Sequence, residues 1–218
     1  MGFACSTIGK KYVMGITGLI WAGFVLTHMA ANMLILIDAQ LYNAYSHALI
    51  SNKPLLYGAE AMLVLSLLVH VVTAFFLTAT NNSARDSKYY METNGEKGVT
   101  FASKTMIFSG TIILVFVVYH LITFKYGPWY TVTYDGVEMR DLHKLVIEVF
   151  QSPAYVVGYI FCLVVLGLHL SHGVSSMFKS WGFNHPRYTP CLEKFAYFYA
   201  AIVALGFISQ PIYVLIQG

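Results

Sequence analysis

Four histidines, each inside a separate apolar stretch, are the residues of this chain with the clearest potential for chemistry. They are His28, His70, His120 and His169. The nitrogens of imidazole need hydrogen-bonding or metal partners, and a hydrocarbon environment supplies none. One buried histidine could be a hydrogen-bonding strut between helices. Four of them, in four successive stretches, instead indicate a shared task, and imidazole is a common ligand of metal ions.

The apolar stretches are long enough to cross a membrane as helices. Residues 154–178 contain no Asp, Glu, Lys or Arg. A helix of that length spans roughly 37 Å, more than the ~30 Å hydrocarbon core of a bilayer. Only 11% of all residues are charged, against about 25% in soluble domains. The sequence therefore predicts an all-α integral membrane protein, a single domain over residues 1–218, with five transmembrane helices at about 12–37, 55–80, 105–124, 152–178 and 195–216.

The thirteen Lys and Arg residues predict the direction of the helices, because cytoplasmic connections carry an excess of them. With the N-terminus inside, nine lie on the inner face, namely Lys10, Lys11, Arg85, Lys88, Lys97, Lys104, Lys179, Arg187 and Lys194. The outer face then holds four, namely Lys53, Lys125, Arg140 and Lys144. We therefore expect the N-terminus inside and the C-terminus outside.

The depth of each histidine follows from this orientation. His28 is residue 17 of the 26 in the first predicted span, and His120 is residue 16 of the 20 in the third. Both spans run outward, so both histidines lie in the outer half. His169 lies past the midpoint of a span that runs inward, so it belongs to the inner half. His70, near the middle of the second span, does not decide its own depth, and it pairs with His169 by elimination.

Two facing imidazoles at each of two depths suit two six-coordinate haem irons. A porphyrin is a flat apolar ligand that a helix bundle can enclose, and the second nitrogen of each ligand can bond to a nearby acceptor. Nearby hydroxyls of the right kind are Thr27, Thr73 and Ser171. The helical rise places the two irons ~10 Å apart in depth. A zinc site would gather three or four ligands at one level, with carboxylates or thiolates among them.

Other features restrict the classes of site and partner. The net charge of +3 is too small to argue for nucleic acid. The cysteines, Cys5, Cys162 and Cys191, form no Cys-x-x-Cys pair, which argues against covalently attached haem and thiolate metal sites. The first apolar run is too long for the core of a cleaved signal peptide, so we expect it to remain as an anchor. Of the other histidines, we expect His47, His143 and His185 in solvated loops, whereas His172, three residues after His169, could compete for ligation.

Three short motifs, taken with the order of the spans, resemble a known family. They are Thr17-Gly18-Leu19, Thr27-His28-Met29, and residues 167–176, which read Gly-Leu-His-Leu-Ser-His-Gly-Val-Ser-Ser. The chain looks like the two-haem cytochrome b membrane subunit of succinate:quinone oxidoreductases and menaquinol:fumarate reductases, in its single-polypeptide, five-helix form. The family often has Gly-Asn after its first histidine, where this chain has Ala31-Asn32. The resemblance implies His28 and His120 as axial ligands of an outer haem b, and His70 and His169 as those of an inner one.

The resemblance also implies partners and a place in metabolism. A flavoprotein subunit would interconvert succinate and fumarate, as in respiratory complex II and the tricarboxylic acid cycle, and an iron–sulfur subunit would dock on the inner face. This chain would be the electron-transfer subunit of that enzyme, carrying electrons between the iron–sulfur subunit and a membrane quinone, with menaquinone favoured. It would lie in the cytoplasmic membrane of a bacterium as a multi-pass protein, in contact with lipid. The whole complex could form a higher oligomer. The direction of turnover stays open.

Two charged residues are candidates for supporting roles. Glu60 is the one carboxylate near the start of a span, ten residues before His70 and at the outer end. We predict that it exchanges protons with the quinone, although a hydrated carboxylate at a helix N-terminus is the simpler interpretation. Lys179 lies after His169 at the inner level, where it could bind a haem propionate or simply follow the excess of inner positive charge.

Two other functions fit part of the pattern. A cytochrome b that serves another respiratory dehydrogenase also uses histidines within the membrane, usually with two on one helix. A haem-free transporter or proton channel with a histidine relay belongs to a different class and more often shows internal repeats or broken helices. One histidine in each of four spans favours the dihaem anchor over both.

Overall fold

Five long apolar helices dominate the computed structural model, which describes residues 6–83 and 104–217. They confirm the five predicted spans. Their bounds are α1 Thr7–Asn32, continued by the 3₁₀ turn η2 Met33–Leu36; α3 Lys53–Ser83; α5 Met106–His120, continued by η3 Leu121–Lys125; α7 Pro153–Ser180; and α8 Thr189–Gln217. α1 and α8 begin several residues before the predicted spans. The reason is that the apolar run marks the part inside the membrane, whereas the helix continues through charged residues at the interface.

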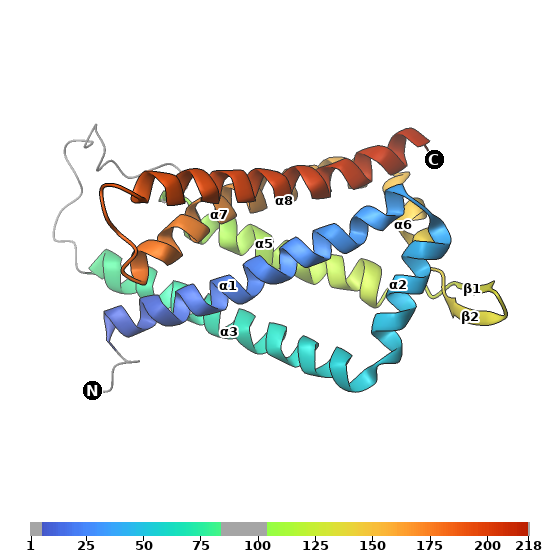
Figure 1. The fold of residues 1–218 in the computed structure, drawn as a ribbon, viewed down its shortest axis with the longest axis horizontal. Coiled ribbons are helices and arrows are strands. Elements are labelled where there is room, and N and C mark those ends of the chain that lie inside the picture. Colours follow the sequence, from blue (N-terminus) through green and yellow to red (C-terminus); the bar gives the residue numbers. More distant parts are fainter. Residues whose placement is uncertain (1–5, 84–103, 218) are drawn as a thin grey trace.

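The five helices run side by side along the long axis of the molecule, and the two chain ends lie at opposite ends of the bundle (Figure 1). We call the end where α1 begins the inner end, and the end where α1 finishes the outer end. α7 and α8 pack most extensively against each other. Small residues permit close approach of backbones. A Cβ added at Gly206 would lie 2.4 Å from Sδ of Met29, so a larger residue there would displace the Met29 side chain where α8 crosses α1.

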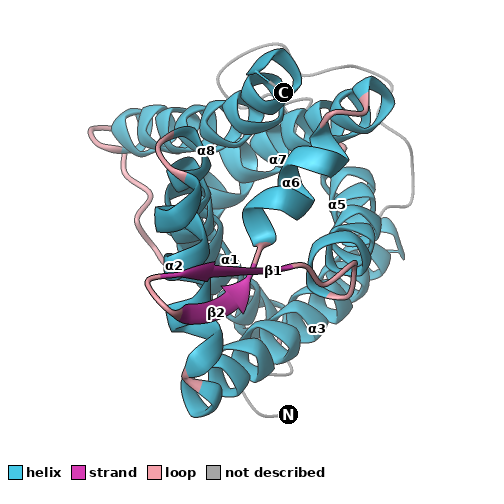
Figure 2. Cartoon of the chain, turned by 90° about the vertical axis from the view of Figure 1, so that its right-hand side faces the viewer, coloured by secondary structure: helices cyan, strands magenta, loops and turns pink. Residues whose placement is uncertain are grey.

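A small cap closes the outer end of the bundle. It consists of helix α2 Ala39–Ser51, the strands β1 Thr131–Tyr134 and β2 Val137–Arg140, and helix α6 Leu142–Phe150. Figure 2 looks onto this end and shows α6 lying over the ring of spans, with the hairpin and α2 beside it. The two strands pair antiparallel around Asp135 and Gly136, whose φ values of 51° and 78° suit a tight hairpin turn. We call these four elements the outer cap.

The cap is built from the two connections on the outer side of the bundle. A turn lies at Asp135-Gly136, and α6 follows it before the fourth span. Helix α2 forms in the connection between the first two spans. Asp38 begins α2 by accepting a hydrogen bond from the backbone N of Leu41 at 2.8 Å, and Tyr42 buries its ring beneath the helix.

Burial is concentrated at the outer end, where the cap meets the spans. One buried cluster joins η2, α2, α6, α7 and α8 and consists of Ile35, Tyr42, Val146, Phe150, Val156, Tyr159 and Val214. A second cluster, of Leu170, Ala200 and Val203, joins α7 to α8. α3 and α5 instead expose most of their apolar side chains, such as Leu65, Phe76 and Val115, as a lipid-facing helix does. Cys5, Arg85, Lys88 and Lys97 lie outside the described residues.

Candidate functional site

The outer pair of histidines meets between α1 and the end of α5. The ring centres of His28 and His120 are 5.9 Å apart, and the ring planes are perpendicular, at 89°. Two imidazoles that bind one metal ion from opposite sides place their ring centres about 6 Å apart, because each metal–nitrogen bond is about 2 Å and each nitrogen lies about 1 Å from its ring centre. The spacing of this pair therefore fits a single metal ion held between two rings.

Aromatic rings surround the outer pair. Phe24 stacks on His28 with ring centres 5.2 Å apart, and Phe207 of α8 approaches the same histidine at 5.9 Å. Phe124 lies 5.2 Å from His120. These contacts hold both imidazole rings in apolar surroundings, which suit a flat apolar ligand.

The Nδ1 atoms of the outer pair lie beside polar side chains, and one of these side chains is hydrogen-bonded to the outer cap. Nδ2 of Asn32 lies 3.4 Å from Nδ1 of His28 and donates to the backbone O of the same histidine at 2.8 Å. The hydroxyl of Tyr42, in the outer cap, donates to Oδ1 of Asn32 at 2.9 Å. Burial raises the pKa of Tyr42, and nearby Arg140 partly offsets that shift. On the other helix, the hydroxyl of Tyr159 lies 3.3 Å from Nδ1 of His120.

The inner pair comes from the other two histidine-bearing spans. Its members are His70 of α3 and His169 of α7. Each Nδ1 lies 3.0 Å from a hydroxyl on a neighbouring helix. His70 faces Oγ1 of Thr17 on α1, and His169 faces Oγ of Ser109 on α5. Of the two pairs expected from depth, His28 and His120 lie in ring contact, and His70 and His169 each face a hydroxyl of α1 or α5.

The hydroxyl partners determine the tautomer of the inner pair. A hydroxyl has one hydrogen, and Thr17 directs its hydrogen to the backbone O of Val13 at 2.9 Å. Ser109 directs its hydrogen to the backbone O of Met106 at 3.1 Å. When the two hydroxyls donate to these carbonyls, their oxygens accept from the histidines, so that Nδ1 carries the proton and the lone pair is on Nε2. This is the arrangement in which a histidine binds a metal ion through Nε2.

Glycines bring the inner rings against the backbone of a neighbouring helix. A Cβ added at Gly18 would lie 3.5 Å from Cε1 of His70, and one added at Gly110 would lie 3.4 Å from Cε1 of His169. Of the glycines on α1 that suggested close approach, Gly15 meets Trp181, whereas nothing lies within 4 Å of a Cβ at Gly23.

The hydroxyls proposed from sequence as histidine partners are not the ones that the structure uses. Thr27 and Ser171 donate to carbonyls of their own helices, at 3.0 Å to Phe24 and 2.8 Å to Leu168. No hydrogen bond joins Thr73 to a histidine within the described residues. The partners are Thr17, Asn32, Ser109 and Tyr159. Their position along the spans could have identified two of them, since Thr17 and Ser109 lie near the inner ends of their spans, level with His169.

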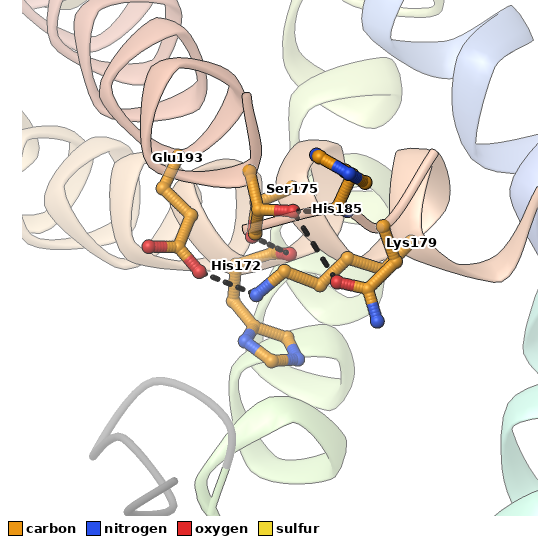
Figure 3. A network of polar contacts seen from close by, with 7 residues as sticks. His172, Ser175, Lys179, His185 and Glu193 are labelled. Atoms are coloured by element: carbon orange, nitrogen blue, oxygen red, sulfur yellow. Dashed lines mark hydrogen bonds and ion pairs between the residues drawn. The ribbon is translucent and has the colours of Figure 1, made fainter. Parts of the chain in front are cut away.

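His172 and Lys179, on the last turns of α7, lie close together (Figure 3). Lys179 does not stand free for a propionate, because its Nζ pairs with Oε1 of Glu193 at 2.5 Å. Ser175 donates to the backbone O of His172 at 3.2 Å, and the His172 side chain is half-buried. Among the two, His169 is the histidine with a hydroxyl partner and a facing histidine.

Glu60 also has a partner of opposite charge. Its Oε1 lies 2.5 Å from Nζ of Lys125, at the end of η3. The carboxylate predicted to exchange protons thus lies at the outer end, as expected, but in an ion pair that the sequence did not reveal.

Within residues 6–83 and 104–217 no three His, Cys, Asp or Glu side chains gather in a way that could hold a metal ion. His47 and His143 lie half-buried in helices α2 and α6, so the prediction of solvated loops is wrong for both, whereas His185 is exposed in the loop before α8.

No protein-family model, curated protein or solved structure matches this chain.

Proposed function

We propose that this chain is the dihaem cytochrome b anchor of a succinate:quinone oxidoreductase or quinol:fumarate reductase. The observation that carries the proposal is the pairing of four intramembrane histidines. Alternate spans contribute one pair to each half of the bundle, and His70, His120 and His169 each have Nδ1 beside a hydroxyl oxygen that can accept a hydrogen bond. The sequence motifs that resemble this family give independent support. Bound haem b would supply one-electron transfer along the bundle.

The residues of the chain would each have a defined part in holding such a group. His28 and His120 would bind one haem iron, and His70 and His169 the other. Thr17 and Ser109 keep the inner imidazoles in the tautomer that leaves Nε2 free, and they fix the direction of each ring. At the outer end, aromatic rings exclude water from the histidines. A group at each end of the bundle suits electron transfer across the membrane.

The proposal includes the partners that the resemblance implies. An iron–sulfur subunit would dock at the inner end, with the flavoprotein subunit attached to it, in the cytoplasmic membrane of a bacterium. Menaquinone would exchange electrons at the outer end, where Glu60 would exchange protons with it. Lys179 would reach an inner propionate only by sharing its charge with Glu193.

The test is a reduced-minus-oxidised spectrum of the purified chain, with a haem count by pyridine haemochrome. We expect about two b-type haems per polypeptide, since each histidine pair supplies the two axial ligands of one iron. Chain purified from a haem-replete membrane with no haem would refute the proposal and favour the haem-free histidine-relay transporter.

A further inference from the structure

An unusual turn follows directly after the outer histidine of α5. The α-helix ends at His120, and residues Leu121–Lys125 form a π-helix, in which the backbone N of Tyr126 donates to the O of Leu121 at 2.9 Å. Such turns are rare and are frequent at functional sites. The extra residue shifts later side chains by about 100° around the helix axis compared with an uninterrupted α-helix. The turn therefore decides which way Lys125 points.

The surrounding structure holds this turn in place from two sides. A Cβ added at Gly127 would lie 1.9 Å from the backbone O of Thr123, so no other residue fits there. Arg140, which is 8% exposed, donates through Nη2 to the backbone O of Phe124 at 2.8 Å. Its guanidinium also lies 4.6 Å from the ring centre of Trp129. The outer cap thus fixes the end of η3 through a buried arginine.

The turn brings Lys125 to Glu60 across two helices that make few other contacts. Nζ of Lys125 lies 2.5 Å from Oε1 of Glu60, and the side chains are 38% and 34% exposed. An ammonium has three hydrogens to donate. Within the described residues, Glu60 takes one, and the ring of Tyr126 lies 5.5 Å from Nζ. Lys125 therefore keeps donor capacity for the oxygen of a ligand beside the Glu60 carboxylate.

We propose that Lys125 completes the quinone headgroup site with Glu60, with Lys125 donating a hydrogen bond to a quinone oxygen and Glu60 exchanging the proton of a quinol hydroxyl. This inference rests on the proposed function. Oxidation of a quinol to a quinone would break two O–H bonds: the Glu60 carboxylate would accept the two protons in turn and pass each to the outer solvent, and the two electrons would go one at a time to the ferric haems, the oxidant that the proposed function supplies. Lys125 keeps its three hydrogens throughout and offsets the charge of the carboxylate.

The experiment follows the reduction of the haems of the purified chain by a soluble naphthoquinol in a stopped-flow spectrometer. We expect Lys125→Met to keep both haems and to raise the half-saturating quinol concentration at least tenfold. Lys125→Arg, which keeps the charge and the donors, should stay within about threefold of the wild type. Glu60→Gln should instead lower the maximal rate at least tenfold. Lys53→Met is the matched control, because it removes an exposed lysine from the outer start of α3, the helix that also carries Glu60.

A charge swap separates the proposed site from a structural ion pair. The double variant Glu60→Lys with Lys125→Glu keeps the attraction between the two helices but exchanges donor and acceptor. We expect both haems and slow reduction by quinol. Restoration of wild-type reduction by the swap, or a Lys125→Met variant as active as Lys53→Met, would overturn the role of Lys125. A wild-type chain without haem would refute the proposed function instead, so the two failures can be distinguished.

Discussion

The two histidine pairs are built in different ways. At the inner end each imidazole rests against a glycine and bonds at 3.0 Å to a hydroxyl whose hydrogen is already donated to its own helix. At the outer end the imidazoles lie among phenylalanine rings, and their polar neighbours are 3.3 and 3.4 Å away. Those neighbours are a phenol and an amide that bonds to a second phenol in the outer cap.

The orientation of the inner histidines depends on side chains inside the spans, whereas that of the outer histidines depends also on the outer cap. The inner pair depends on two short hydroxyl side chains within the spans, so its tautomer is determined inside the bundle. The outer pair depends on Asn32 and Tyr159, and Asn32 is itself oriented by Tyr42 of the cap. Changes in the cap should therefore affect the outer site and leave the inner site unchanged.

The largest expected effect is the loss of a whole haem from one pair. His169→Ala should reduce the haem count from about two to about one per polypeptide, because one iron loses an axial ligand. His120→Ala should remove the other haem, and the two remaining spectra should differ. His172→Ala is the control and should retain both. If His169→Ala retained both haems and His172→Ala lost one, the inner ligand would be His172.

A smaller effect should distinguish the partners of the two pairs. Thr17→Val leaves the Nδ1 hydrogen of His70 without an acceptor, and loss of such a partner weakens metal binding about 10–100-fold. Tyr159→Phe removes a longer contact and should weaken the outer site less than about tenfold. The rate of haem transfer to excess apomyoglobin measures both. Thr111→Val is the control, because the hydroxyl of Thr111 donates to the backbone O of Ile107 in its own helix, at 2.8 Å; equal rates for the two threonine variants would contradict the role of Thr17.

A change confined to the cap tests whether the outer site depends on it. Asn43 is fully buried, donates to Oδ1 of Asp141 at 2.9 Å and accepts from the backbone N of His143 at 2.9 Å. Asn43→Ala should cost about 2 kcal/mol, because two buried polar groups lose their partner. Thermal loss of the outer haem should begin at lower temperature, with the inner haem unchanged. The control Asn52→Ala removes an exposed cap of α3 and should change little; equal sensitivity of both haems to Asn43→Ala would mean that the two sites are not independent.

The smallest expected effect is a dependence on alkaline pH. Burial raises the pKa of Tyr42 above its ordinary value of 10.0. The folded chain therefore keeps a proton that the unfolded chain releases above that pH. The stabilising contribution is complete below pH 10 and falls as the pH rises, by at most about 1.4 kcal/mol per pH unit. Tyr42→Phe should show a shallower loss of thermal stability between pH 9 and 11. An identical slope in the variant would argue against this titration.

The sequence was sufficient to predict the spans, because a bilayer imposes length and apolar composition directly on the chain. It was also sufficient to pair the histidines, since position along a span translates into depth through the helical rise. It did not predict α2 or the partners of Nδ1. Thr17 is 53 residues from His70, and Ser109 is 60 residues from His169, so only the packing of helices brings each hydroxyl to its ring.

The sequence alone thus determined which spans carry a histidine and how deep each histidine lies, because depth depends only on distance along one helix. The tertiary structure decided which groups surround each histidine. Rotation of helices about their axes and the π-turn after His120 are set by packing between distant segments, such as Arg140 against Phe124 and Gly127 against Thr123. Those choices determine the tautomer of the inner pair and the meeting of Lys125 with Glu60.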